Sequence, residues 1–301
     1  MKHSVWTQWV DIAVPNGIER LDPNNTPLDS SDLSSVTFYV PPYMGGSRAL
    51  DYVNSMPNLK VLQLSNAGYE DAIDYLRPGL ILCNGRGIHD ASTAELAVGM
   101  IIASLRGFQS FVLSQERAHW NPALFRSIND RKIGILGFGS IGRNIARILS
   151  GFDVEVIGFS RSGNDGSVNV EEFDKYLPTL DIVILILPLS QESHHFFNAR
   201  RLALLKDGAL LVNVARGGIV DTDALLTEIR TGRITAALDV TDPEPLPADH
   251  PLWKEKGIFI TPHVGGFSTA FEPRARKLVE SQLIRLASGR PLENVVAQGM
   301  A

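Results

Sequence analysis

The 301-residue sequence has little cysteine, no excess of positive charge and no long apolar run. The single cysteine, Cys83, cannot form an internal disulfide, and without a cluster of cysteine and histidine no thiolate zinc site is expected. The net charge of -5 and the pI near 5.8 argue against a nucleic-acid partner, because binding that polyanion needs a basic surface. A reducing cytoplasm fits this composition best.

The sequence also disfavours export and membrane insertion. Its first residues include Gln8 and Asp11 where a signal peptide has an unbroken apolar stretch. No apolar run reaches the length of about 20 residues that a membrane-spanning helix needs. We therefore expect a soluble, unexported, cytoplasmic protein.

The composition, with 44% hydrophobic and 20% charged residues, is globular, and the length suggests two domains. From Lys132 onward, short runs rich in Val, Ile and Leu alternate with longer amphipathic segments. Short runs that are apolar on both faces predict parallel strands covered by helices on both sides, a doubly wound α/β unit. Six runs have this character: Ile133–Leu136, Val154–Phe159, Ile182–Leu187, Ala209–Val214, Thr235–Val240 and Ile258–Thr261.

The amino-terminal part predicts a second, smaller α/β domain. An amphipathic stretch from Thr269 to Ala287, with a 3.6-residue period, would carry the chain back to it. We predict that residues 1–93 and 269–301 form this substrate domain and that 94–268 form the doubly wound domain. Three further runs look like its strands: Val36–Val40, Leu59–Leu64 and Leu80–Leu82.

A glycine-rich segment follows the first of the six strands. Gly137 permits a tight turn, Gly139 lets the backbone approach a pyrophosphate, and Gly142 lets helix and strand pack closely. The helix that begins near Ser140 and Ile141 offers free N–H groups to phosphates. Glycine-rich turns also serve as plain connections, but the strand before this one and the helix after it favour a dinucleotide site.

The end of the second strand indicates which dinucleotide binds. An NAD site has an acidic residue there for the ribose hydroxyls, whereas this chain has Ser160, Arg161 and Ser162. Without a carboxylate to repel a 2′-phosphate, and with Arg161 to bind it, the segment favours NADP(H). Arg143, directly after the last glycine, would assist. The alternative is that Arg161 is a solvated loop charge.

Three charged residues follow the last three predicted strands. Arg216 comes after the fourth strand, Glu244 after the fifth and His263 after the sixth. The carboxyl ends of parallel strands lie at one edge of the sheet, together with the glycine turn, so all three should face the cofactor crevice. Each alone has a plain explanation, as a turn cap, a solvated acid or a backbone-bonded imidazole. Their joint occurrence favours catalysis.

The three side chains suit the reduction of a carbonyl. Hydride transfer leaves an alkoxide that needs a proton, which a protonated His263 can supply. The guanidinium of Arg216 can orient a carboxylate and polarise the carbonyl. The carboxylate of Glu244 would stabilise the imidazolium and keep the donor charged.

Over most of its length the chain resembles the D-isomer-specific 2-hydroxyacid dehydrogenases. Seven motifs in the same order are far more specific than a glycine fingerprint alone. The resemblance implies a doubly wound (Rossmann) cofactor domain and a smaller, flavodoxin-like substrate domain. The matching segments are Asn66–Glu70, Thr93–Ala97, Gly137–Gly142, Leu187–Leu189, Asn213–Asp221, Leu238–Val240 with Pro243–Pro247, and Thr261–Gly266.

The resemblance also implies roles for individual residues. In that family the Arg grips the substrate carboxylate and carbonyl, the His is the acid and base, and the Glu pairs with it. These roles fall on Arg216, His263 and Glu244. Backbone N–H groups near Ala67 and Gly68 would bind the carboxylate, and no metal is implied. Cofactor contacts are implied for four further residues: Pro188, Val214, Ala215 and Asp239, the last at the nicotinamide amide.

A homodimer built around the cofactor domain is a further implication of the resemblance. The segment Ala94–Leu105 is nearly all apolar or small, too short for a membrane and too uniformly apolar for a surface helix. We expect it to be buried between domains or subunits and to take part in the dimer.

Two departures from the family pattern sharpen the prediction. The usual acid after the second strand is replaced by Ser160 and Arg161, as in NADPH-preferring glyoxylate and hydroxypyruvate reductases of the family. The chain ends at Ala301, so we expect no C-terminal regulatory extension like that of long phosphoglycerate dehydrogenases. A formate dehydrogenase is disfavoured because it carries Gln where this chain has Glu244.

The sequence thus predicts an enzyme, an NADPH-dependent reductase of glyoxylate, hydroxypyruvate or a similar small 2-ketoacid that forms the D-2-hydroxyacid, with NAD(H) as a possible cofactor. Two alternatives stay open: an NAD enzyme like D-3-phosphoglycerate dehydrogenase, and a non-enzymatic, dinucleotide-sensing scaffold like a corepressor. Substrate choice should depend on side chains around the carboxylate loop, such as Tyr69, Arg86 and the Tyr43–Ser47 loop.

Overall fold

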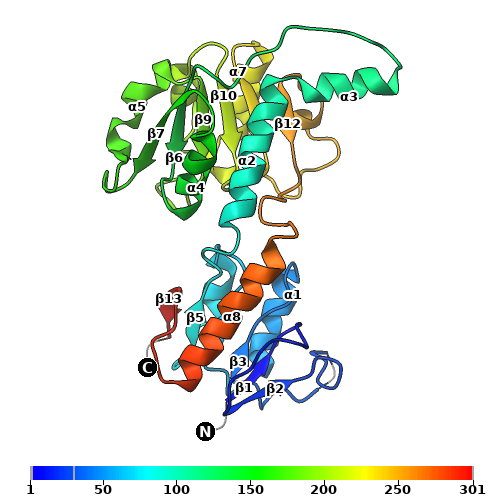
Figure 1. The fold of residues 1–301 in the computed structure, drawn as a ribbon, viewed down its shortest axis with the longest axis vertical. Coiled ribbons are helices and arrows are strands. Elements are labelled where there is room, and N and C mark those ends of the chain that lie inside the picture. Colours follow the sequence, from blue (N-terminus) through cyan, green and yellow to red (C-terminus); the bar gives the residue numbers. More distant parts are fainter. Residues whose placement is uncertain (1–2, 30, 300–301) are drawn as a thin grey trace. The chain divides into compact units, whose positions relative to one another are not determined.

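The computed structural model describes residues 3–29 and 31–299, which form two compact units. Unit 1 holds the residues up to His89 and those from Thr269 onward, and unit 2 runs from Asp90 to Ser268 (Figure 1). We expected the cofactor domain to start at residue 94; in the structure its first helix already begins at Asp90.

Unit 2 is built on a seven-stranded sheet in the order β12-β11-β10-β9-β6-β7-β8. All neighbouring strands are parallel, and the order reverses between β6 and β9, which is the place where open α/β sheets bind ligands. The strands are β6 (Arg131–Leu136), β7 (Val154–Ser160), β8 (Val168–Asn169), β9 (Ile182–Leu185), β10 (Leu210–Asn213), β11 (Thr235–Leu238) and β12 (Ile258–Ile260).

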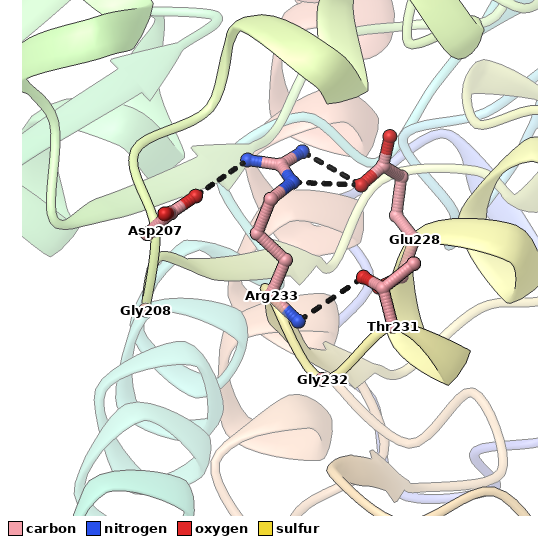
Figure 2. Close-up of a pocket in the computed structure, with 6 residues that line it drawn as sticks. All are labelled: Asp207, Gly208, Glu228, Thr231, Gly232 and Arg233. Carbon is pink, nitrogen blue, oxygen red and sulfur yellow. Dashed lines mark hydrogen bonds and ion pairs between the residues drawn. The ribbon is translucent and has the colours of Figure 1, made fainter.

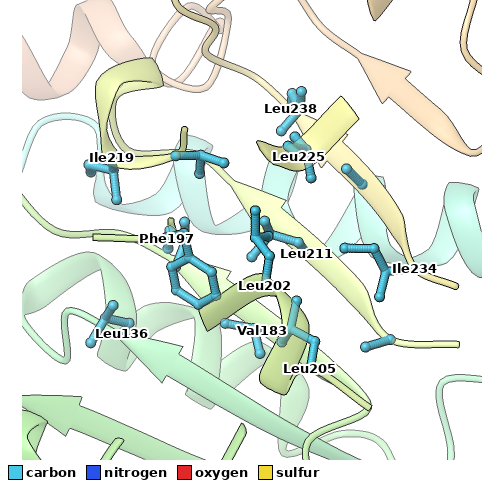
Figure 3. Packing of buried hydrophobic residues seen from close by; sticks show 14 of the residues in the cluster. Leu136, Val183, Phe197, Leu202, Leu205, Leu211, Ile219, Leu225, Ile234 and Leu238 are labelled. Atoms are coloured by element: carbon cyan, nitrogen blue, oxygen red, sulfur yellow. The ribbon is translucent and has the colours of Figure 1, made fainter. Parts of the chain in front are cut away.

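Helices cover both faces of this sheet. The helices are α2 (Asp90–Leu105), α3 (Phe108–Glu116), α4 (Ser140–Leu149), α5 (Phe173–Tyr176), α6 (Ala199–Leu204) and α7 (Thr222–Arg230), with the 3₁₀ turns η3 (Val170–Glu172), η4 (Leu177–Thr179), η5 (Gly217–Ile219) and η6 (Pro251–Trp253). Because side chains alternate along a strand, β9 sends Ile182 and Ile184 to the core under α2 and α4. It sends Val183 and Leu185 to the other core, where Figure 3 places Val183 near Leu202 of α6.

Unit 1 contains a six-stranded sheet in the order β13-β5-β4-β3-β1-β2, parallel except for β13. Its strands are β1 (His3–Trp6), β2 (Ile18–Leu21), β3 (Phe38–Tyr39), β4 (Val61–Gln63), β5 (Ile81–Cys83) and β13 (Val295–Gln298). Helix α8 (Phe271–Ala287) packs on one face through Phe271, Ala275, Val279 and Leu283. On the other face lie helix α1 (Gly46–Asp51) and the turns η1 (Tyr52–Ser55) and η2 (Glu70–Tyr75).

The predicted α/β class with parallel sheets is confirmed, and so are all six strands of the cofactor domain, within a few residues at their ends. Half of the residues of the segment Ala94–Leu105 are buried, and this buried face lies within unit 2. There Ala97 and Ile101 pack with Ile145 of α4 and with the sheet.

Among the described residues, no single helix is long and apolar enough to cross a membrane. Helices α2 and α3 reach the required length and apolar character only when they are taken together, and the pair is bent by 66° at the break between them. Half of α2 is buried in the core of unit 2, since its buried residues include Ala94, Val98 and Met100.

Candidate active site

The glycine turn after β6 has the backbone that a dinucleotide site requires. Gly137 has a φ of +102°, and a Cβ there would lie 2.1 Å from the Ile186 carbonyl oxygen. A Cβ on Gly142 would lie 2.4 Å from the Gly137 carbonyl oxygen, so both positions exclude a side chain. Around Gly139, by contrast, no heavy atom of the described chain lies within 4 Å of the Cβ position, at the N-terminus of α4. These residues fit a bound pyrophosphate.

The first residues of α4 add a polar contact to this turn. The hydroxyl of Ser140 donates a hydrogen bond to the carboxylate of Asp90, the first residue of α2. Ile141 is half-buried in the core beneath α2 and α4. The start of α4 is therefore fixed by α2 on one side and by the sheet on the other.

The turn after β7 is organised by Ser160. Its hydroxyl lies 2.7 Å from the Ser167 hydroxyl and accepts the backbone N–H of Gly163 at 3.1 Å. Arg161 is exposed, and Asn169 holds its carbonyl by a side-chain hydrogen bond of 3.2 Å. Ser160 therefore shapes the turn, while the guanidinium of Arg161 is open to solvent.

Arg216 follows β10 in a tightly held segment that includes the predicted cofactor contacts Val214 and Ala215, both buried. The side chain of Asn213 accepts the N–H of Ala215 at 3.1 Å and donates to the carbonyl of Arg216 at 2.9 Å. The Arg216 guanidinium is half-buried and donates to the Ala215 carbonyl at 2.7 Å. A Cβ on Gly217 would lie 1.9 Å from the Thr241 carbonyl oxygen, so this segment requires glycine.

Glu244 and His263 meet as predicted. The Glu244 carboxylate contacts Nδ1 of His263, and the two side chains are 39% and 45% exposed. Strands β10, β11 and β12 are neighbours in the sheet, so Arg216, Glu244 and His263 follow three adjacent strand ends. Within the described residues, Arg216 makes no hydrogen bond or ion pair with Glu244 or His263, and the hydrogen bond of its guanidinium to the Ala215 carbonyl uses only the Nη1 atom.

Asp239 positions the loop that carries His263. This residue is 2% exposed, and its carboxylate accepts the Thr261 hydroxyl at 2.6 Å and the N–H groups of Val264 and Gly265 at 2.9 Å. Its carbonyl accepts the N–H of His263 at 2.7 Å, and His263 has a φ of +52°. Sequence reasoning missed this role, although an acid directly after a buried strand must find partners.

Pro188 lies beyond the end of β9, and its carbonyl accepts the Ser193 hydroxyl at 2.8 Å. Next to this loop, His194, His195 and Asp242 bring ligand atoms within 4.8 Å of one another. The two imidazole rings are stacked, with centroids 4.0 Å apart and planes inclined by 23°. Their lone pairs lie in nearly parallel planes, which do not meet at the ~2.1 Å of a metal–imidazole bond. The cluster in this arrangement does not form a metal site.

The loop of Ala67 and Gly68 belongs to unit 1 and follows β4. Its carbonyls are held by the segment after β5: Asn84 donates to Ala67 at 2.7 Å, and a ring nitrogen of His89 lies 3.0 Å from the Ser65 carbonyl oxygen. In the part of the chain that the structure describes, the N–H groups of Ala67 and Gly68 have no partner. They remain available to an anion.

A hollow of about 500 Å³ lies elsewhere on unit 2 (Figure 2). Gly208 and Arg233 in its lining precede β10 and β11, so the hollow is at the amino edge of the sheet, opposite the glycine turn. Arg233 is bound by Glu228 at 2.8 Å and Asp207 at 3.4 Å. This hollow therefore plays no part in the site at the carboxyl edge.

Comparison with known proteins identifies the family. The family model "D-isomer specific 2-hydroxyacid dehydrogenase, NAD binding domain" matches residues 98–265, which is more than half of the chain. The chain belongs to this family. It is therefore an NAD(P)-dependent oxidoreductase whose cofactor domain carries the glycine turn and the three catalytic candidates.

Individual relatives of this dehydrogenase include the glyoxylate reductase of Thermofilum pendens, 32% identical over 79% of this chain and 75% of that protein. The D-3-phosphoglycerate dehydrogenase of Methanocaldococcus jannaschii is 29% identical over 82% of this chain but only 49% of that protein. A solved structure of an NADPH-dependent glyoxylate/hydroxypyruvate reductase from Sinorhizobium meliloti, in complex with NADP and sulfate, superposes with a TM-score of 0.79. It has 26% identity and covers 94% of this chain and 92% of that one.

Proposed function

We propose that this dehydrogenase reduces a small 2-ketoacid, such as glyoxylate or hydroxypyruvate, to the D-2-hydroxyacid with NADPH. The observation that carries the proposal is the contact between Glu244 and Nδ1 of His263, one strand end away from a half-buried Arg216. An imidazole backed by a carboxylate is a proton donor, and a guanidinium beside it suits a carboxylate and carbonyl oxygen.

The residues divide the reaction between them. When bound, the nicotinamide supplies the hydride that adds to the carbonyl carbon. Arg216 binds the substrate carboxylate and the carbonyl oxygen. The Nε2–H of protonated His263 gives its proton to the alkoxide, while Glu244 stabilises the imidazolium through Nδ1. Asp239 keeps the imidazole in place by holding its loop.

The preference for NADPH rests on the turn after β7. The pyrophosphate would lie over Gly139 at the N-terminus of α4, with its phosphates near the N–H groups of Ser140 and Ile141. The adenosine 2′-phosphate would then meet the exposed guanidinium of Arg161, which stands between two serines, Ser160 and Ser162, rather than beside an acid in sequence. NADPH-dependence of the Sinorhizobium meliloti relative supports this assignment.

We also propose that the enzyme is a homodimer. Helix α3 and the segment that follows it project from unit 2 (Figure 1). Trp120 is 94% exposed and Leu124 is fully exposed, and α3 adds further exposed apolar side chains. Several exposed apolar side chains on one projecting segment favour an association site. The exposed residues on α3 are Phe108, Phe111, Val112 and Leu113.

A panel of 2-ketoacids tests the function. The purified protein would be assayed with glyoxylate, hydroxypyruvate, 3-phosphohydroxypyruvate and pyruvate, each with NADPH and with NADH. We expect turnover of the two small ketoacids with NADPH. Turnover confined to 3-phosphohydroxypyruvate with NADH would favour a phosphoglycerate dehydrogenase, and binding of cofactor without any turnover would favour a scaffold.

The same panel with His263→Ala tests the mechanism. We expect kcat to fall by roughly 10²- to 10⁴-fold, because the alkoxide loses its proton donor. His250→Asn is a matched control, since asparagine can replace His250 as the acceptor for the N–H of Leu252. Undiminished kcat in His263→Ala would remove His263 from the mechanism.

A further inference from the structure

Arg143 makes three contacts, with Asp165 and Phe138, at the adenosine end of the proposed cofactor site. Its Nη2 atom lies 3.6 Å from Oδ2 of Asp165, and its Nη1 atom donates to the Asp165 carbonyl at 2.9 Å. The guanidinium also lies over the ring of Phe138, within the glycine turn, at 4.9 Å from the centroid. The cation that directly follows Gly142 is thus already paired with a carboxylate.

The turn after β7 determines the position of Asp165. Its φ is +54°, and it lies between the left-handed glycines Gly163 and Gly166. The hydroxyl of Ser160 anchors this turn from the strand end through Gly163 and Ser167. The Asp165 side chain is 83% exposed, so the turn, rather than packing, fixes where its charge lies.

The charge of the second cation of this region, Arg161, also acts on a carboxylate. A hydrogen bond from the Ser190 hydroxyl is the main reason that the pKa of Glu192 is lowered, and the charge of Arg161 lowers it further. Both cations that a 2′-phosphate would meet therefore have an acidic neighbour. Arg143 is the one whose neighbour is in direct contact.

We propose that Asp165 is a cofactor-specificity residue, whose carboxylate competes with the 2′-phosphate of NADPH for Arg143 and so limits the preference for NADPH over NADH. The inference rests on the proposed binding of NADPH at this turn. A 2′-phosphate has to displace this counter-ion to gain the guanidinium. The neutral 2′-hydroxyl of NADH does not compete with Asp165 for Arg143. Asp165 therefore reduces the difference in affinity between NADPH and NADH.

Asp165→Asn is the variant of choice. Asparagine has the same shape as aspartate and tolerates a positive φ equally well, so the turn is retained while the charge is removed. Glu171→Gln is the control, because it changes the net charge equally at another exposed carboxylate of unit 2. The double variant Arg143→Ala/Asp165→Asn tests whether the effect passes through Arg143.

Binding of adenosine fragments measures the effect without catalysis. Calorimetric titration with adenosine 2′,5′-bisphosphate and with 5′-AMP reports the 2′-phosphate contribution. We expect Asp165→Asn to bind the bisphosphate about twofold to fivefold more tightly, the range for a surface ion pair, with 5′-AMP unchanged. Glu171→Gln should match the wild type. An unchanged bisphosphate affinity in Asp165→Asn, or an equal gain in the absence of Arg143, would overturn the proposal.

Steady-state kinetics separates this inference from the proposed function. We expect the ratio of kcat/KM for NADPH to kcat/KM for NADH to rise in Asp165→Asn by the same factor. If the wild type prefers NADH, the proposed cofactor preference fails, but a raised ratio in Asp165→Asn still supports the role of Asp165. If the wild type prefers NADPH and the ratio does not change, only the role of Asp165 fails.

Discussion

Glu244 contacts Nδ1 of His263, and this leaves Nε2 as the ring nitrogen that can meet a substrate. The two residues follow neighbouring strands and are 19 positions apart in the chain. Their pairing fixes the direction in which the imidazole can deliver a proton. The contribution of the Glu244 charge can be tested separately from that of the hydrogen-bond geometry.

Replacing Glu244 with Gln should lower kcat by roughly 10- to 100-fold. Glutamine can still accept a hydrogen bond from Nδ1, but it no longer stabilises the imidazolium by its charge. The KM for NADPH should stay within about twofold, since the glycine turn is untouched. Stopped-flow measurement of NADPH oxidation at saturating ketoacid reports the change, and a wild-type kcat would exclude an electrostatic role for Glu244.

Replacing Asp239 with Asn should destabilise unit 2 and impair catalysis together. In asparagine an NH₂ group replaces one carboxylate oxygen, and an NH₂ group cannot accept a hydrogen bond. One buried donor of the Thr261–Gly265 loop therefore loses its partner. We expect a loss of about 1–3 kcal/mol in the free energy of unfolding. Urea denaturation measures it against Asp223→Asn, a change at an exposed acid of α7. Equal stability of the two variants would contradict the positioning role.

Replacing Arg161 with Asp should reverse the cofactor preference. The new carboxylate would repel a 2′-phosphate and offer acceptors to a ribose 2′-hydroxyl. We expect kcat/KM for NADPH to fall by roughly tenfold or more while that for NADH does not fall. Parallel losses with both cofactors would indicate damage to the turn instead of a change in recognition.

Replacing Trp120 with Asp should dissociate the proposed dimer. A charge within a buried apolar contact costs several kcal/mol unless it is paired. Light scattering coupled to gel filtration would show a monomer for Trp120→Asp and a dimer for the wild type. Val10→Asp is the control, because Val10 is an exposed apolar residue of unit 1. A wild-type mass for Trp120→Asp would place the interface elsewhere.

Asp181 should give unit 2 a pH-dependent contribution to stability. Burial on its own would raise the pKa of Asp181, but hydrogen bonds from the Lys132 backbone N–H and the Lys206 ammonium, together with the charges of Lys206 and Arg131, bring this pKa below its usual 3.8. A lowered pKa in the folded state stabilises the protein above pH 3.8, and the contribution disappears as the pH falls through the folded-state pKa.

The variant Asp181→Asn should therefore be less stable than the wild type at pH 7, by roughly 1 kcal/mol. The difference should shrink as the pH falls below about 4. Thermal unfolding followed by circular dichroism between pH 3 and 7 measures it. A stability difference that is constant over this range would mean that the Asp181 charge contributes nothing.

The sequence predicted those elements whose pattern is local. The six runs of the cofactor domain are apolar on both faces because helices cover both sides of the sheet, and this left a strong signal. Three strands of unit 1 were missed: β2 and β13 lie at the edges of the sheet and expose part of their side chains, and the interior strand β1 has only four residues. Strand β8 has only two residues, which is too short for any period.

In the candidate site, too, features with a local sequence pattern could be predicted and features that depend on distant contacts could not. The positions of Arg216, Glu244 and His263 could be predicted because each lies within about six residues of the end of a recognisable strand. The role of Asp239 toward Val264 and Gly265, and the pairing of Arg143 with Asp165, depend on contacts between residues more than 20 positions apart. No periodicity or spacing in one sequence encodes such contacts, because turn geometry and register create them.

His263 has a left-handed backbone conformation, which is unfavourable for stability, while its side chain is the proposed proton donor. Asparagine and glycine adopt a positive φ at lower cost than histidine does. A protein selected only for resistance to unfolding would be expected to replace His263 with one of them and to lose the proposed proton donor. The imidazole at this position is thus maintained against the conformational preference of its own backbone, and variants chosen for thermostability should be screened for turnover at this residue first.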